Sequence, residues 1–451
     1  MSATARSARA VARPLRQART SSLAIDLAFV GGIALVLGSI RLTRPSLWVD
    51  ETFTAKAVHE NLFNPIDQYH WLYYMLLKPW SLVAGTSEWA VRLPSVFAAM
   101  VACCLLVVLA RRLFDRRVAL VSGLFLATSP FLVKWSQQAR SYSFVLTAGI
   151  LATLLLLRAL ERNSRGAWAL YGLALSLVFA MQPVSAFVLV PAHVVLVAPR
   201  RRAVLPHGLV APCVVVVLGV PWAFARVKQT PAWDWLPRPS VESAAKTLLE
   251  VSGVAGLGVV LAVLGLVVLR RRSETGLGLF LGTWAFAPFA LAFVVSFVKP
   301  IYLDRYLITA APAFALLAAV AFFALGSRWG SLLAGAVVVA TALGLAHGYT
   351  RGAAGWRGEN WRDAVAAVRQ RQDEAQAVVV VPWWAEPAAT YYGASAMSTS
   401  TADSIWVLNW SESGHGLPQA VRGQLGFGDH RLVEELNFGR RVSAQLWRRQ
   451  P

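Results

Sequence analysis

Charged residues are scarce in this sequence. Asp, Glu, Lys and Arg together make up 15% of its 451 positions, whereas a soluble globular chain is roughly a quarter charged. This shortage argues against a soluble enzyme. Hydrophobic residues, at 57%, exclude an intrinsically disordered chain, because disorder requires low hydrophobicity. The length instead suits a bundle of about ten membrane helices with loops and a tail.

Cysteine is also rare, with only three residues, and no CxxC spacing occurs. Cys103 and Cys104 are adjacent, and all three cysteines, including Cys213, fall inside apolar runs. We interpret them as small apolar packing residues rather than a disulfide or metal framework. Low-complexity segments and repeats of 20–50 residues are lacking as well.

Long apolar runs are what the sequence has instead. About eleven of them predict an all-α polytopic membrane protein. They lie at 22–40, 93–110, 118–133, 143–157, 168–181, 185–198, 208–225, 248–269, 277–297, 306–326 and 329–347. Basic residues precede the first run, but the run is long and no clear A-x-A site follows. We therefore expect an uncleaved first span rather than a cleaved signal peptide.

The net charge is +20, and the basic residues responsible for it are distributed according to the predicted topology. With a cytoplasmic N-terminus, the inside segments carry 19 Lys and Arg against 4 acids, the outer loops 13 against 9, and the region after His347 11 against 10. Short Arg clusters on one side are what the positive-inside rule requires. The basic excess therefore indicates a plasma-membrane protein and not a nucleic-acid-binding protein.

Three domains are expected from this division. They are a cytoplasmic basic tail at 1–21, a transmembrane domain at 22–348 whose first outer loop spans 41–92, and an extracytoplasmic α/β domain at 349–451. In the last domain ENWRDAVAAVRQRQ predicts a helix with Asn360 as N-cap, and AQAVVVVP and SIWVLNW predict strands. EPAATYYGAS predicts another helix, and RLVEELNFGRRVSAQLWRR a helix or turn followed by an edge strand. Its role is either a scaffold over the outer face or an acceptor-binding module.

Two neighbouring carboxylates, Asp50 and Glu51, follow the first predicted span in SLWVDETFT. Neighbours on a helix diverge by about 100°, so we expect them to do different jobs. A partly desolvated carboxylate has a raised pKa and can act as a general base. The alternative is a solvated pair at the start of a helix, where acidic residues are common.

Groups that can bind an anion recur on the same predicted side of the membrane. His70, Tyr73 and Tyr74 share a helix face by their spacing, and imidazole and phenol can donate hydrogen bonds to phosphate oxygens. Cations and other donors gather in two further clusters, where the alternative is snorkelling side chains that anchor helix ends. These are Lys134, Gln137, Gln138, Arg140 and Tyr142 in the first cluster and Lys299, Asp304, Arg305 and Tyr306 in the second.

In order and spacing, several motifs resemble the N-terminal half of GT-C glycosyltransferases. These are SLWVDETFT, YHWLYYMLLKPW, SEWAVRLPSVFAAM and SPFLVKWSQQARSYSFVL. The chain is most similar to the group of protein mannosyltransferases and aminoarabinose transferases. The resemblance covers about residues 45–160 well and RYLITAAPAFALLA more loosely; the tail is not covered. It implies a polyprenyl-phosphate sugar donor and transfer at the outer face of the membrane.

The resemblance also implies site residues. The acidic motif of the family matches Asp50 and Glu51, with Asp50 as the catalytic carboxylate and Glu51 orienting a cation or the acceptor. Its H-x-P-L-Y-Y-like motif matches YHWLYY without the proline, and its S-Q-E-A-R-x-Y motif has Gln138 in place of the acid. The residues expected to bind the donor phosphate are His70, Tyr74, Lys78, Arg140, Tyr142 and Arg305.

The function expected is an inverting transfer of a sugar, mannose-like by preference, to an acceptor hydroxyl on a lipid, glycan or protein. A divalent cation, Mg²⁺ or Mn²⁺, beside Asp50 and Glu51 is compatible with their oxygen ligands, but no metal site is assigned. Two alternatives are a flippase or transporter of lipid-linked sugars and a non-catalytic subunit of a glycan-assembly complex. A transporter would need polar residues deep in several spans, whereas the ionisable residues here gather at one side.

Overall fold

The computed structural model describes residues 20–59, 70–227, 236, 238–253, 256–350, 358–372, 376–395, 402–412, 417, 422–423 and 429–450. The chain divides into two compact units. The first comprises Met1–Ile40, Gln68–Tyr73 and Leu93–His347, and the second comprises Arg41–Asp67, Tyr74–Arg92 and Gly348–Pro451. Most of the first predicted loop therefore groups with the C-terminal region. Residues 1–19 of the predicted basic tail lie outside the described residues.

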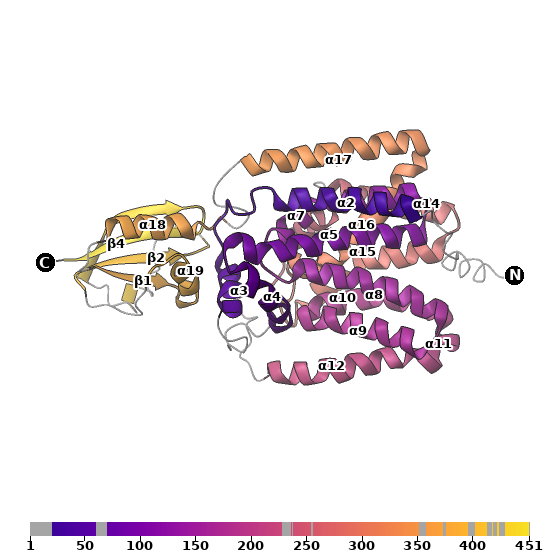
Figure 1. The fold of residues 1–451 in the computed structure, drawn as a ribbon, viewed down its shortest axis with the longest axis horizontal. Helices are drawn as coiled ribbons and strands as arrows, with labels where there is room; N and C mark the ends of the chain where they lie inside the picture. Colours follow the sequence, from indigo (N-terminus) through magenta and orange to yellow (C-terminus); the bar gives the residue numbers. More distant parts are fainter. Residues whose placement is uncertain are drawn as a thin grey trace. The chain divides into compact units, whose positions relative to one another are not determined.

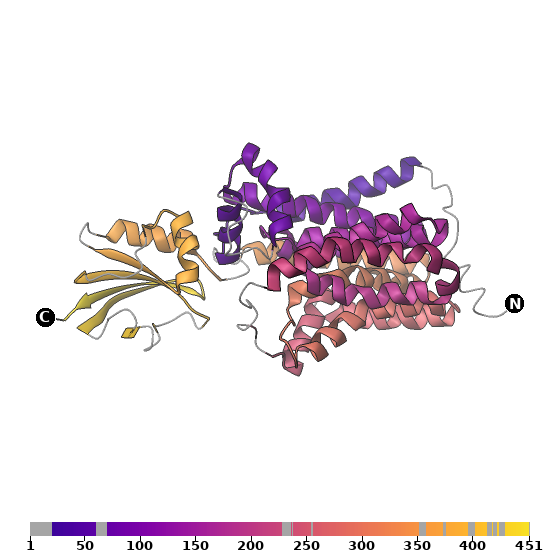
Figure 2. The same cartoon turned by 90° about the horizontal axis from the view of Figure 1, so that it is seen from below.

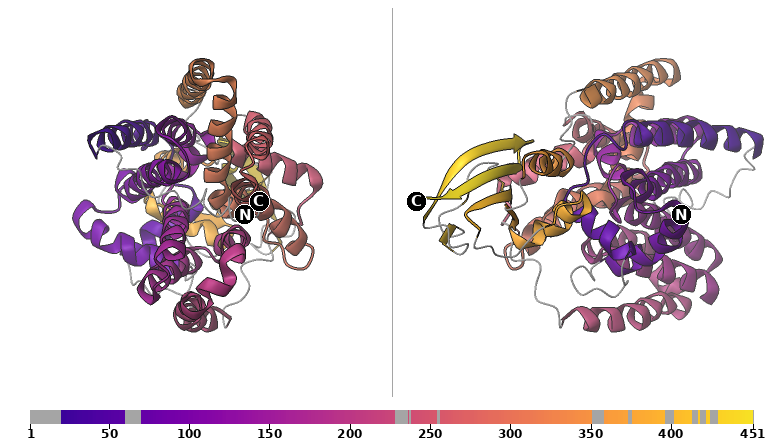
Figure 3. Two further views of the ribbon diagram at one scale, coloured as in Figure 1. Left: turned by 90° about the vertical axis from the view of Figure 1, so that its right-hand side faces the viewer. Right: turned by 60° about the vertical axis from the view of Figure 1, so that its left-hand side comes forward.

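The first unit is a bundle of helices, which Figure 1 and Figure 2 show from two sides and the left view of Figure 3 shows nearly end-on. Its longer helices are α2 (Thr20–Ser39), α5 (Glu88–Leu113, from Leu93 on), α8 (Tyr142–Arg162), α9 (Arg165–Met181), α10 (Pro183–Val197), α12 (Val210–Val227), α14 (Leu257–Arg271), α15 (Thr275–Val295) and α17 (Ser327–Thr350). Shorter helices are α6 (Arg116–Ala127), α7 (Pro130–Ser136), α11 (Arg201–Gly208), α13 (Val241–Ser252), η4 (Asp304–Ala310) and α16 (Ala311–Phe322).

Helix α16 forms the centre of this bundle. Every one of its residues is buried, and it packs against α6, α14 and α15. A Cβ atom built on Gly265 of α14 would lie 2.3 Å from the carbonyl oxygen of Leu317 in α16. The backbones of the two helices therefore approach closely only because this position is glycine, a common device between membrane helices.

The eleven expected apolar runs fall on helices of different kinds. Seven helices among the described residues are long and apolar enough to cross a membrane, or up to nine if each of two bent helix pairs is one span. The bent pairs are α6 with α7 and α13 with α14, while α9 and the Val210–Gly219 stretch of α12 are shorter apolar helices. These seven helices, two bent pairs and two shorter helices together account for the eleven apolar runs, and hydropathy alone does not show which of them are bent or short.

The second unit combines two helices of the first loop with a C-terminal α/β layer. Its elements are α3 (Val49–His59), α4 (Trp71–Ala84, from Tyr74 on), α18 (Trp361–Arg371), β1 (Ala377–Val381), η6 (Trp383–Ala385), α19 (Glu386–Tyr391), β2 (Ser404–Trp410), β3 (His430–Phe438) and β4 (Val442–Arg449). The strands form one sheet in the order β1-β2-β4-β3, in which β1 and β2 are parallel and the other pairs antiparallel.

A single apolar core joins α3 to the C-terminal layer. Val49 of α3 belongs to the same buried cluster as Trp361, Trp406 and Leu408, and Phe53 packs against it. Helix α18 covers one face of the sheet (Figure 1). The start of α3 is thus built into the same folded body as the last hundred residues.

Four of the elements predicted for the C-terminal region are confirmed, and one prediction is wrong. Asn360 caps α18 by accepting from the backbone N–H of Asp363 at 3.3 Å, and β1, α19 and β2 lie where expected. However, RLVEELNF is the edge strand β3, and VSAQLWRR is the internal strand β4. Glu and Leu favour a helix by propensity, but Gly439, at φ 88°, closes a three-residue hairpin loop that pairs the two segments.

Candidate active site

The two acidic residues expected to be catalytic lie in the first turn of α3, in different environments. The Glu51 side chain is fully buried and binds Arg92 in a bidentate ion pair. Arg92 Nε lies 2.8 Å from Oε1 of Glu51, and an Nη atom lies 2.5 Å from Oε2. The Asp50 side chain is half-buried. Neighbouring carboxylates on one helix therefore have separate surroundings, as their angular spacing predicted.

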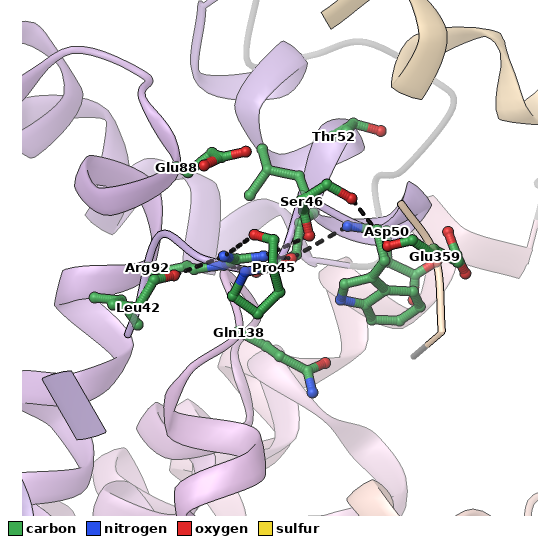
Figure 4. A network of polar contacts seen from close by, with 12 residues as sticks. Leu42, Pro45, Ser46, Asp50, Thr52, Glu88, Arg92, Gln138 and Glu359 are labelled. Carbon is green, nitrogen blue, oxygen red and sulfur yellow. Dashed lines mark hydrogen bonds and ion pairs between the residues drawn. The ribbon is translucent and has the colours of Figure 1, made fainter. Parts of the chain in front are cut away.

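Arg92 also fixes the backbone that leads into α3. Its guanidinium donates to the carbonyl oxygens of Leu42, Pro45 and Ser46 at 2.7–2.9 Å (Figure 4). A planar guanidinium with five donors suits this combination of one carboxylate and three carbonyls. The buried charge is thereby paired and hydrogen-bonded, which a buried ion requires. Both carboxylate oxygens of Glu51 are therefore occupied by Arg92.

A third carboxylate, Glu359, lies at the same helix start and was not found from the sequence. Its side chain is buried, and Oε2 accepts from the backbone N–H of Val49 at 3.2 Å and from Trp361 Nε1 at 2.9 Å. Ser46 Oγ donates to its backbone oxygen at 2.9 Å. Figure 4 shows Glu359 and Asp50 at the same end of this network. Because Val49 precedes Asp50 directly, Glu359 holds the backbone from which the Asp50 side chain projects.

The surroundings of Glu359 shift the pKa of its carboxyl group. Burial raises the pKa of the Glu359 carboxyl, and the nearby Asp50 charge acts in the same direction, while the hydrogen bonds from Trp361 and Val49 oppose the shift. A buried carboxyl whose pKa is shifted by a neighbouring charge is a feature of sites that move protons. In the sequence, the residue is one acid before a helix N-cap, about 310 positions from α3, so no local signal connects it to Asp50.

Two residues of the C-terminal region, Tyr392 and Arg362, form a further group of contacts near the start of α3. The Tyr392 hydroxyl accepts from the backbone N–H of Leu47 at 2.6 Å and donates to Glu88. Arg362 pairs with the same Glu88 carboxylate. Burial raises the pKa of the Tyr392 phenol, and its hydrogen bond to Glu88 adds to that shift. The phenol therefore remains a neutral donor at physiological pH.

Four of the six expected phosphate-binding residues lie in the first unit, and three of them form a chain of contacts. His70 Nδ1 lies 3.2 Å from Ser141 Oγ, and its ring meets Tyr142 edge-on at 6.4 Å between centroids. The Arg305 guanidinium lies 6.0 Å from the Tyr142 ring centroid and 5.8 Å from that of Trp135. Arg305 stands in η4, and Tyr142 begins α8.

The fourth of these residues, Arg140, directly precedes Ser141. Its backbone oxygen accepts from Ser95 Oγ at 3.1 Å. Arg140 and Arg305 are 5% and 7% exposed, so two guanidinium groups are buried in one region of the helical unit. Buried arginines with aromatic neighbours are suited to a bidentate interaction with a phosphate.

Lys134, the other cation of the first cluster, has two acidic partners. Lys134 Nζ lies 3.0 Å from Asp304 Oδ2 and 3.8 Å from Glu250. Gln137 donates to the carbonyl oxygen of Ile40, and Gln138 to that of Lys134. These residues join α7 to neighbouring elements, which makes them parts of the packing around the arginines.

Lys78 and Tyr74 belong to the second unit. The Lys78 ammonium donates to the carbonyl oxygens of Val58 and His59 at the end of α3. Lysine at a helix C-terminus satisfies carbonyl groups that lack helical partners, so this placement favours a structural role for Lys78. Tyr74 is buried. Their binding to a donor phosphate stays a prediction.

The donor set does not fit a divalent cation at the two acids. Both oxygens of Glu51 face the Arg92 guanidinium, and Glu359 Oε2 accepts two N–H groups. Among the described residues, no three His, Cys, Asp or Glu side chains form a group that could hold a metal ion.

Comparisons with known proteins agree with the fold and the motifs. Residues 71–224 match the family model of dolichyl-phosphate-mannose-protein mannosyltransferases. The ArnT protein of Cupriavidus metallidurans, in a crystal structure bound to undecaprenyl phosphate, superposes with a TM-score of 0.64 at 16% identity. The match covers 95% of this chain and 98% of ArnT. The chain therefore has the fold of ArnT.

Two further solved structures share the GT-C fold. The Archaeoglobus fulgidus oligosaccharyltransferase has a TM-score of 0.52 at 16% identity, covering 81% of this chain and 61% of that one. Arabinofuranosyltransferase AftD from Mycobacteria has a TM-score of 0.55 at 14% identity, covering 94% and 40%. No curated protein sequence matches the chain. The resemblance to GT-C enzymes is confirmed, and the chain is a multi-pass integral membrane protein.

Proposed function

We propose that the protein transfers a sugar from a polyprenyl-phosphate donor to an acceptor hydroxyl at the outer face of the plasma membrane. The mannosyltransferase family match and the undecaprenyl phosphate bound to ArnT support this class of donor. A mannose-like sugar is the preferred one. The N-terminus is cytoplasmic and the C-terminal domain extracytoplasmic in this proposal, which rests on the distribution of Arg clusters in the sequence.

The observation that carries the mechanism is the setting of Asp50. Its helix turn is fixed from both sides, by Arg92 through Glu51 and by Glu359 through the N–H of Val49. A general base must be held within hydrogen-bond reach of the proton that it removes. In the proposed step the acceptor oxygen attacks the anomeric carbon and its proton passes to the Asp50 carboxylate. The bond between that carbon and the phosphate oxygen breaks, and polyprenyl phosphate leaves as an anion.

The arginines of the helical unit serve the leaving group in this proposal. Arg140 and Arg305 bind the phosphate and stabilise the negative charge that develops on it, together with His70 and Tyr142. Donors placed in advance at a developing charge contribute strongly to catalysis because they need no reorganisation during the reaction. Attack from the face opposite the phosphate inverts the configuration, so a β-linked donor gives an α-linked product.

The experiment is direct. Membranes containing the protein are incubated with a panel of polyprenyl-phosphate sugars, each labelled in the sugar, and the labelled product is isolated. The proposal predicts transfer from a mannose-type donor, with inversion at the anomeric carbon. Transfer from nucleotide sugars alone, or retention of configuration, would contradict it.

A further inference from the structure

A cavity of about 540 Å³ lies within the second unit, against α3 and the start of α19. One wall is the face of α3 that carries Thr52, Phe53 and Lys56, and the opposite wall is formed by η6 and α19. Its lining includes Phe53, Lys56, Trp383, Trp384, Glu386 and Thr390. None of them takes part in the network around Glu51 and Glu359.

The lining combines aromatic faces with hydrogen-bonding groups. Trp383 is 73% exposed, which is a large apolar area to leave in water for a residue that has no place in the core. Trp384 is held by an edge-on contact with Trp410, with 4.7 Å between ring centroids. Exposed aromatic residues with a polar group beside them mark binding sites rather than packing.

The chemistry of this lining selects one class of ligand. A sugar ring has a face of C–H groups that can lie on an indole and a rim of hydroxyl groups that donate and accept hydrogen bonds. The Glu386 carboxylate and the Thr390 hydroxyl supply acceptors, and the Lys56 ammonium supplies donors. A lipid chain would leave these polar groups without hydrogen bonds, which is costly.

The position of the cavity connects it to Asp50. Phe53 lies three residues after Asp50 on α3, about 4.5 Å along the helix axis at a rise of 1.5 Å per residue. Both side chains therefore leave the helix within one turn of each other. A chain of sugar units that fills the cavity would reach the helix turn of the proposed general base.

We propose that this cavity binds the acceptor, and that the acceptor is a glycan whose sugar ring stacks on Trp383. The inference rests on the proposed function, because it assigns the acceptor subsite of the same reaction. Trp383 and Glu386 are specificity-determining residues in this proposal, and they contact the acceptor away from the reacting atoms.

Binding is tested without catalysis, on the full-length protein in detergent with the substitution Asp50→Asn. Mannotriose and arabinotriose are the probes, and saturation-transfer NMR reports contact with the protein. We expect one of them to bind, and Trp383→Ala to weaken its binding at least fivefold, with partial rescue in Trp383→Tyr. Trp329→Ala is the matched control, because Trp329 of α17 is 68% exposed in the other unit.

Kinetics then separate this inference from the proposed function. In otherwise wild-type protein, Trp383→Ala and Glu386→Gln should raise the KM for the glycan acceptor at least fivefold and leave the KM for the donor unchanged. An unchanged acceptor KM, or competition by a serine-containing peptide but by neither oligosaccharide, would overturn the acceptor assignment. If the wild-type protein transfers no sugar, the proposed function fails, while the binding experiment still decides whether the cavity holds a glycan.

Discussion

Arg92 and Glu51 form a buried, bidentate ion pair that joins the first turn of α3 to the start of α5, across 41 residues of chain. The pair leaves Asp50 outside it, on the neighbouring position of the same turn. Sequence similarity to GT-C enzymes singled out the two acids together, but the structure buries Glu51 fully and Asp50 only in part.

Removal of one partner of this pair should destabilise the protein strongly. Arg92→Ala leaves the Glu51 charge buried and unpaired, and loss of one partner of a buried pair costs about 3–5 kcal/mol of unfolding free energy. The double variant Glu51→Leu with Arg92→Met should recover part of that loss, because no unpaired charge remains. Unfolding temperature in detergent is the measurement, with Arg448→Ala, at an exposed position on β4, as the control.

An Arg92→Ala protein as stable as the control would show that the pair does not stabilise the fold. Equal losses of stability in the single and double variants would show that Arg92 stabilises the protein mainly through its hydrogen bonds to the carbonyl oxygens of Leu42, Pro45 and Ser46.

Glu359 should make stability depend on pH. Because burial raises the pKa of this carboxyl in the folded protein, its contribution is fully present below the unfolded pKa. The contribution is lost as pH rises through the higher folded pKa. Glu359→Gln keeps an oxygen for the N–H groups of Val49 and Trp361 and removes the charge. Stability of this variant should fall less than that of the wild type over that pH range.

The measurement is the unfolding temperature of both proteins at a series of pH values in one detergent. The difference between the two curves isolates Glu359 from the other titrating groups. Parallel curves would mean that the charge of Glu359 is the same in the folded and unfolded states.

The buried arginines of the helical unit should govern use of the donor. A hydrogen bond to a charged group contributes about 1.5–3 kcal/mol, so Arg140→Ala and Arg305→Ala should each weaken donor binding by about 10- to 100-fold. Titration with undecaprenyl phosphate measures this affinity directly. Arg328→Ala, at an exposed position of α17, is the control. An affinity that matches the control in both variants would remove these residues from the phosphate site.

Lys78 should behave differently from these arginines. Its ammonium bonds the last carbonyl groups of α3, so Lys78→Met should lower the unfolding temperature, and reduce affinity for undecaprenyl phosphate less than Arg140→Ala does. The same titration compares the two variants. A larger loss of affinity in Lys78→Met would support the role inferred from the sequence motif instead.

Site residues that belong to a local sequence motif could be predicted. Site residues whose role comes from contacts between distant parts of the chain could not. Asp50 and Glu51 could be identified because they stand together after an apolar run, and α18 because Asn360 caps it. Arg92 and Glu359 were missed because their importance arises from contacts made 41 and 310 residues away. The β3 segment was assigned wrongly because pairing with β4 outweighs the helix propensity of its Glu and Leu residues.

The role of Asp50 is tested most directly by the rate of sugar transfer in Asp50→Asn. The turnover of a labelled polyprenyl-phosphate sugar is measured in folded, membrane-inserted protein, with undecaprenyl phosphate affinity as a check on the donor site. A positioned general base contributes about 10²- to 10⁴-fold to a rate, so we predict a loss of that size with donor affinity retained. Wild-type turnover in Asp50→Asn would contradict the account.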